Sequence, residues 1–133
     1  MSRFEIIPYD KVGDISFQLT REAVRNLLGK YREFKKSKSS GETTDDFKFC
    51  HVYYDMNNNV EAVEFFGGIE LVYNGKNLFS FSYNELLQFL KENSCGYKVS
   101  DSGIIIEKLG VAAYVPDKRT IESILVYRRG YYD

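Results

Sequence analysis

The sequence predicts an α+β fold, in which a mostly antiparallel sheet of about six to eight strands carries two capped helices on one face. Three observations predict it: two helix-start signals, two segments patterned as β-hairpins, and a content of 11 Tyr and 10 Phe, residue types that favour strands. The 133 residues, 44% of them hydrophobic, suffice for a single domain over residues 1–133, whereas two domains would each be short of core.

The first helix is predicted to begin after Thr20. A threonine at this position accepts a hydrogen bond from one of the free N–H groups of the first helical turn. Leu19 and Val24 have the spacing of a hydrophobic staple across this cap. Gly29 tolerates the left-handed backbone that commonly ends a helix, so we expect the helix to stop there.

The second helix has the signature of a capping box. Ser82 is the expected N-cap, and Glu85, three residues later, can reach back to the backbone N–H of Ser82. The helix is therefore predicted to begin at Tyr83 and to end near Asn93, before Gly96.

Placing Thr20 on Ser82, 62 positions later, exposes an internal similarity. At this offset Gly13 falls on Gly75, so each helix is preceded by the same glycine turn. Upstream, residues 4–7 resemble residues 69–72, and the pseudo-repeats run over about residues 4–66 and 69–127.

The similarity continues downstream, where residues 51–63 match residues 112–124 at an offset of 61. Each segment is a β-rich run that meets a turn of Asp, Asn or Pro type and returns through Val-Glu-Ala-Val or Ile-Glu-Ser-Ile. Both segments are predicted hairpins. The alternative to a true repeat is that two hairpins in an aromatic-rich chain look alike by chance.

The connectors between helix and hairpin differ in the two copies. Residues 30–46 are polar and predicted to form a mobile loop, whereas residues 102–107 of the second copy predict an extra strand. The first connector contains a basic segment, with Lys30, Arg32, Lys35, Lys36 and Lys38.

The overall charge and the cysteines narrow the functional class. With 18 Lys and Arg against 19 Asp and Glu, the chain has no basic excess for nucleic acid or an anionic membrane. It has no apolar run of membrane-spanning length and begins without a secretory-signal pattern, so a cytoplasmic location is expected. Cys50 and Cys95 are then expected to be free thiols.

No catalytic or cofactor motif is present. Cys50 and His51 are adjacent in a predicted strand, so their side chains point to opposite faces and cannot form a dyad. His51 is the only histidine and no cysteine pair has ligand spacing, so neither a metal nor a cofactor is expected, and the protein is predicted not to be an enzyme. The remaining enzymatic alternative is an acid/base pair among strand carboxylates, Glu61, Glu64, Glu70 and Glu122.

Alternation within the hairpins separates a core face from a second face. Val63 and Phe65 match Ile124 and Val126, all apolar, which assigns this side of the strands to the core. The opposite side is rich in tyrosine, as protein-binding surfaces are. The predicted partner-binding residues are His51, Tyr53, Glu64, Phe66, Tyr114, Tyr127 and Arg128. The alternative is that these aromatic residues only pair across strands.

Residues 13–29, with Gly13, Thr20, Glu22, Val24 and Leu28-Gly29, resemble the helix entry of the beta-lactamase-inhibitor-like and small outer-membrane lipoprotein domains. The inhibitor is a tandem of such units. The whole chain resembles the small bacterial immunity proteins of polymorphic toxin systems in its size, its composition and its two Tyr-turn-Val-Glu hairpins.

The second resemblance implies a bacterial cytoplasmic protein that neutralises a toxin domain by direct binding. The alternative is a nucleic-acid-associated module, in which sheet aromatics stack on bases and the basic segment from Lys30 to Lys38 contacts phosphates.

Overall fold

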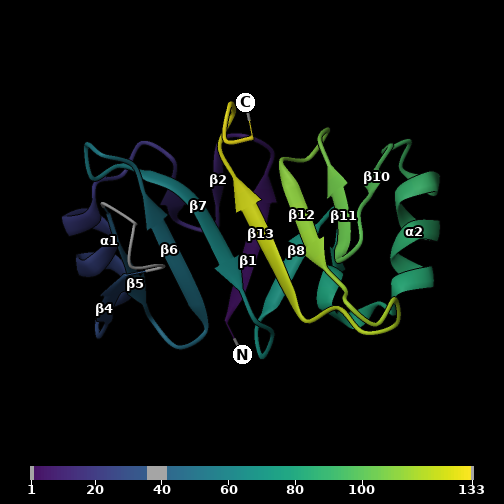
Figure 1. Cartoon of the computed structure of the whole chain (residues 1–133), viewed down its shortest axis with the longest axis horizontal. Coiled ribbons are helices and arrows are strands. Elements are labelled where there is room, and N and C mark those ends of the chain that lie inside the picture. Colours follow the sequence, from purple (N-terminus) through teal and green to yellow (C-terminus); the bar gives the residue numbers. More distant parts are fainter. Residues whose placement is uncertain (1, 36–41, 133) are drawn as a thin grey trace.

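The computed structural model describes residues 2–35 and 42–132. It confirms the α+β class: the described residues form two α-helices and thirteen strands in two mostly antiparallel sheets. Figure 1 shows the larger sheet in front, with one helix at each end of the molecule.

The larger sheet has eight strands, each antiparallel to its neighbours. In spatial order these are β10 (Lys98–Val99), β11 (Gly103–Ile106), β12 (Val111–Tyr114), β13 (Ser123–Tyr127), β7 (Val60–Phe65), β6 (Cys50–Tyr54), β5 (Thr43–Asp46) and β4 (Arg32–Lys35).

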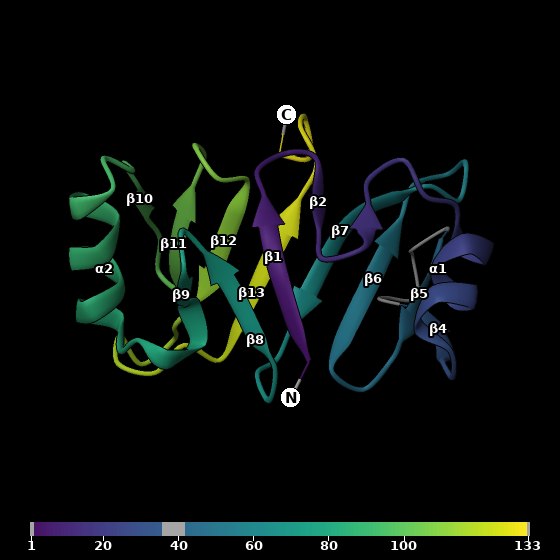
Figure 2. The same ribbon diagram turned by 180° about the vertical axis from the view of Figure 1, so that it is seen from behind.

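A second sheet of five strands packs against one face of the first and is in front in Figure 2. Its order is β3 (Ile15–Ser16), β2 (Lys11–Val12), β1 (Arg3–Ile7), β8 (Glu70–Tyr73) and β9 (Lys76–Asn77). β1 and β8 are parallel, and the other neighbours are antiparallel. The sequence did not predict this second layer, because three of its strands are two residues long and show no alternation.

The helices α1 (Arg21–Leu28) and α2 (Tyr83–Glu92) flank the smaller sheet on the same side of the larger one, and a 3₁₀ turn, η1 (Leu78–Ser80), precedes α2 (Figure 2). Both predicted starts are confirmed. The Thr20 hydroxyl accepts the N–H of Ala23, and Ser82 and Glu85 form the complete capping box.

The two halves of the chain make the same contacts between helix and hairpin. Thr20 forms an isolated β-bridge with Asn59, and Ser82 forms one with Thr120. The halves meet where β7 pairs with β13, and Glu64 there faces Leu125, its counterpart 61 positions later. Equivalent residues paired in this way indicate a pseudo-twofold axis that passes through the sheet at this pair.

The alignment of residues 4–7 with residues 69–72 does not fit this pseudo-twofold axis. A twofold axis perpendicular to a sheet relates antiparallel strands, whereas β1 and β8 are parallel neighbours. The counterpart of the β8–β9 hairpin is the β2–β3 hairpin, because each turns through two residues, 74–75 and 13–14. β1 is thus a single central strand without a partner copy.

The predicted loop over residues 30–46 is also corrected. It contains the strands β4 and β5, which pair with each other, while Lys36 and Lys38 lie outside the described residues. β4 is the edge strand of the larger sheet, and its charged side chains are exposed to water. Its sequence therefore lacks the alternation of apolar and polar residues by which a strand is predicted. The strand predicted within residues 102–107 is confirmed as β11.

The core lies between the larger sheet and the layer of helices and small sheet. The predicted core face is confirmed, since Val63, Phe65, Ile124 and Val126 are fully or almost fully buried. Both cysteines are buried free thiols, as expected. Neither helix in the described part of the chain is long and apolar enough to cross a membrane.

Candidate functional site

Six of the seven predicted binding residues lie on the outer face, the side of the eight-stranded sheet that the helices and the smaller sheet leave uncovered and that faces the viewer in Figure 1. Alternation places them there, because their strand neighbours Val52, Val63 and Val126 are buried in the core. The strands contribute His51, Tyr53, Glu64, Tyr114 and Tyr127, and Phe66 follows the end of β7. Arg128 does not belong to this set: it comes one residue after the outward-facing Tyr127, so the same alternation places it on the core side of the sheet.

Glu64 lies at the centre of the outer face, at the pseudo-twofold axis. The Tyr53 hydroxyl donates to its Oε1 at 2.5 Å, and the Ser123 hydroxyl donates to its Oε2 at 2.8 Å. Burial, together with the hydrogen bond to this carboxylate, raises the pKa of Tyr53. Tyr53 therefore stays a donor, and both carboxylate oxygens of Glu64 are held in place.

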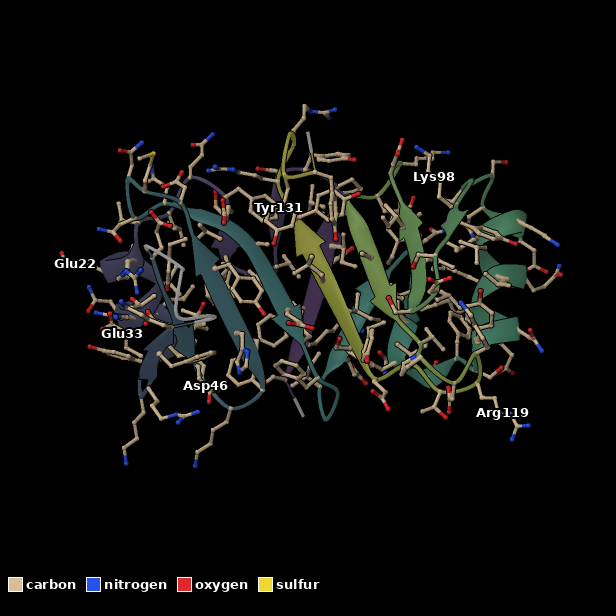
Figure 3. The ribbon with its side chains drawn as sticks, viewed as in Figure 1. Glu22, Glu33, Asp46, Lys98, Arg119 and Tyr131 are labelled. Carbon is tan, nitrogen blue, oxygen red and sulfur yellow. The ribbon has the colours of Figure 1, made fainter. Side chains whose placement is uncertain are left out.

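The C-terminal segment covers the middle of the outer face. Tyr131 stacks on Tyr127 with the ring centroids 5.7 Å apart, and Tyr132 meets the same ring edge-on at 4.9 Å. Tyr9, from the β1–β2 turn, also meets this ring edge-on, with the centroids 6.0 Å apart. Figure 3 shows Tyr131 over the upper end of β13.

This cover buries two of the predicted contact residues. Tyr53 and Tyr127 are only 8% and 4% exposed, so neither presents a ring to a partner in this conformation. Alternation assigns a side chain to a face of the sheet, but it does not show that residues beyond the last strand fold back over that face.

Predicted contact residues remain accessible in two areas beside this cover, and the first is the aromatic patch of Phe34, His51 and Phe66. The His51 ring lies 5.1 Å from the ring of Phe34 and 4.6 Å from that of Phe66, in edge-to-face contacts. Phe66 is 41% exposed. Asp46 Oδ1 lies 3.5 Å from the Nε2 atom of His51 and gives the patch a polar rim.

The second accessible area is the outer groove, an open depression of about 300 Å³ over β11, β12 and β13. Its apolar lining comes from Ile105, Ala112 and Leu125, and the exposed rings of Tyr114 and Tyr132 also line it. Polar groups come from Ser100, Ser102, Ser123 and the fixed carboxylate of Glu64.

Arg128, the last predicted contact residue, is used within the fold. Its guanidinium lies 2.7 Å from Asp55 and 3.7 Å from Glu61. These ion pairs join the end of β13 to Asp55 in the turn between β6 and β7 and to Glu61 in β7. The prediction of Arg128 as a contact residue on the outer face is therefore wrong, because its guanidinium is engaged on the other side of the sheet.

The strand carboxylates do not all converge. Glu70 is on the five-stranded sheet, whereas Glu64 is on the outer face of the other sheet, so the core separates these two. Glu122 is exposed before β13, and Glu61 contacts Arg128. Within residues 2–35 and 42–132 no group of three His, Cys, Asp or Glu side chains could hold a metal ion.

Sequence reasoning missed a buried ionic network beneath α1. Asp45, fully buried in β5, accepts two hydrogen bonds from Arg25, at 2.7 and 2.8 Å. It also accepts from Arg21 at 3.3 Å and from the Tyr54 hydroxyl at 2.9 Å. The i, i+4 spacing of the two arginines places them on one side of the helix and was the available signal.

This network has a structural role. α1 buries only Val24 in the core, so the ion pairs from Arg21 and Arg25 supply much of its attachment to the sheet. The hydrogen bonds with Asp45 raise the pKa of Arg25, and burial raises the pKa of Tyr54.

No family model, no curated protein and no solved structure matches this chain.

Proposed function

We propose that this chain is a non-enzymatic protein-binding domain that uses the outer face of its eight-stranded sheet. The main support is the composition of the outer groove, where an apolar lining, two exposed tyrosines and the fixed Glu64 carboxylate lie together. In the described part of the chain, neither the helices nor the smaller sheet cover this face. Aromatic side chains with oriented polar groups are the usual composition of energetically important contact sites.

Rigidity supports the proposal. The groove is built on neighbouring antiparallel strands, and its central carboxylate is held by hydroxyls from the flanking strands β6 and β13. A preformed surface loses little conformational entropy when a partner docks. The aromatic patch of Phe34, His51 and Phe66 adds apolar contact area on the other side of the C-terminal segment.

The partner in this proposal is a toxin domain, and the chain is a bacterial cytoplasmic immunity protein that neutralises it by covering its active or substrate-binding surface. The support is the resemblance in size, composition and hairpin pattern, together with an exposed surface suited to protein contacts.

The test is capture of partners from native-cell lysate on the immobilised chain, followed by quantitative mass spectrometry. Tyr114→Ala in the outer groove and Phe66→Ala in the aromatic patch are each expected to weaken capture of one partner about tenfold, as loss of an interface hot spot does. Leu27→Ala, at an equally exposed site on α1, is the matched control and should leave capture unchanged.

Equal capture by all variants would contradict the proposal. Nuclease treatment of the lysate separates it from the nucleic-acid alternative, because a protein partner remains bound after the treatment, whereas bridging nucleic acid does not.

A further inference from the structure

A second surface lies at the other end of the larger sheet, at the basic groove between the end of α1, the edge strand β4 and the β5–β6 turn. This depression has a volume of about 480 Å³. Leu28, Tyr31 and Phe47 give it an apolar lining. Tyr31 is half-exposed and lies 6.2 Å from Phe47, ring to ring.

Three cations line the same groove, namely Lys30, Arg32 and Lys48. Both lysines are exposed, neither has an ion pair within the described part of the chain, and the Arg32 side chain is 76% exposed. Their charges therefore face solvent around an apolar lining.

The one carboxylate in the lining, Asp46, is already engaged. It lies 3.4 Å from Arg32 and 3.5 Å from His51, and it accepts the backbone N–H of Lys48 at 2.8 Å. The last bond holds Lys48 in a left-handed conformation, with φ of 78°, which is uncommon for lysine. The turn thus fixes where Lys48 is presented, and the groove keeps a net positive charge.

We propose that the basic groove binds an acidic peptide segment of another protein, one that also carries an aromatic side chain. Its carboxylates would pair with Lys30, Arg32 and Lys48, and its ring would pack against the half-exposed Tyr31, which rests on the buried Phe47. This site is separate from the outer groove and does not depend on the function proposed for that surface.

The surroundings favour a short acidic peptide over nucleic acid. Figure 3 shows Glu22 and Glu33 at the same end of the molecule as Asp46, and Glu33 is half-exposed. A nucleic acid carries a charge on every phosphate and would bring some of them close to these carboxylates. A peptide can place its few carboxylates at the cations alone.

The test uses fluorescence polarisation with the whole chain and a labelled hexapeptide of alternating glutamate and phenylalanine. The double variant Lys30→Gln, Lys48→Asn removes two cations, and asparagine suits the left-handed backbone. We expect it to bind about fivefold to tenfold more weakly, as the loss of two exposed ion pairs implies. The wild-type affinity should also fall as salt is raised.

The matched control is Lys76→Gln, Lys118→Asn, which removes the same charge elsewhere and also replaces a lysine of positive φ. It should bind like the wild type, with unchanged melting for both double variants. Peptides with glutamine for glutamate, or serine for phenylalanine, should bind weakly.

Four results would overturn the proposal. They are equal loss in both double variants, full binding of the glutamine peptide, no binding of the acidic peptide at millimolar concentration, and tighter binding of a labelled hexathymidine at the same lysines. The last would assign the groove to nucleic acid. None of them bears on Tyr114 or Phe66, so a failure here is distinguishable from failure of the outer-face proposal.

Discussion

At the scale of single residues, burial distinguishes side chains that sequence patterns treat alike. Tyr114 and Tyr127 both point to the outer face of the sheet, yet Tyr114 is 45% exposed and Tyr127 is 4% exposed. Asp45 and Asp46 are adjacent acidic residues, but only Asp45 is fully buried, where Arg21 and Arg25 meet it. The cost of substituting each residue follows from these environments and not from residue type.

Asp45→Asn is expected to lower the free energy of unfolding by about 3–5 kcal/mol, because it leaves two arginines without their buried counter-charge. Urea unfolding measures the change. Glu107→Gln is the control, since its ion pair with Lys98 is exposed and screened by water, so its loss should barely move the midpoint. Similar midpoints for both variants would show that the network does not fasten α1.

Tyr127→Ala is expected to lower the free energy of unfolding by about 3–5 kcal/mol, because it removes the ring on which Tyr9, Tyr131 and Tyr132 pack. Tyr127→Phe keeps the ring and should cost about 1 kcal/mol or less. If Tyr127→Ala melts like Tyr114→Ala, the C-terminal segment does not cover this residue in solution.

At the scale of elements, the two helices share a start signal but are attached differently. α1 buries Val24 alone and relies on ion pairs, whereas α2 buries four side chains, Tyr83, Leu86, Phe89 and Leu90. In each case the first residue of the helix donates its N–H to the turn of its own hairpin, Arg21 to Asn58 at 2.8 Å and Tyr83 to Arg119 at 2.9 Å. The start of each helix, its N-cap and first residue, is therefore also the point where the helix is bonded to the larger sheet.

Thr20→Ala and Ser82→Ala are each expected to lower the free energy of unfolding by about 0.5–2 kcal/mol, because each removes the side-chain acceptor for a free helix N–H. Denaturant titration gives both values. Ser102→Ala, outside any helix, is the control. Unchanged midpoints for Thr20→Ala and Ser82→Ala would argue against these caps.

At the scale of the whole molecule, ion pairs join parts of the chain that are distant in sequence. Asp55, in the β6–β7 turn, is paired with Arg128 at the end of β13. Although burial acts to raise it, hydrogen bonds from Asn59, Arg128 and Asn57 keep the pKa of Asp55 below its ordinary value. Asp46 and Glu33 also have lowered pKa values.

These carboxylates predict acid sensitivity. A group whose pKa is lower in the folded state contributes stability that is complete above its ordinary pKa and is lost as the pH falls through the lower folded-state value. The free energy of unfolding should therefore be steady above pH 5 and fall below about pH 4. Urea midpoints at pH 7, 5 and 3 test this, and Asp55→Asn should show a smaller drop; equal midpoints at all three pH values would contradict it.

Features that depend on neighbours along the chain could be predicted from residue order. Both N-caps, the ends of both helices, the hairpins and the core side of β6, β7, β12 and β13 follow from residue spacing, because caps and alternation are local geometry. The position of the candidate site on the outer face follows from the same alternation.

Contacts between distant parts of the chain could not be predicted in this way and are known from the folded structure. The parallel pairing of β1 with β8, the second sheet, the ion pairs at Asp45 and the cover of Tyr131 and Tyr132 over Tyr127 join residues far apart in the chain or beyond its last strand. Short sequence patterns do not predict such contacts. The contacts are stabilised by the burial of apolar surface between helices and strands that are distant in sequence, and that burial depends on how the whole chain packs.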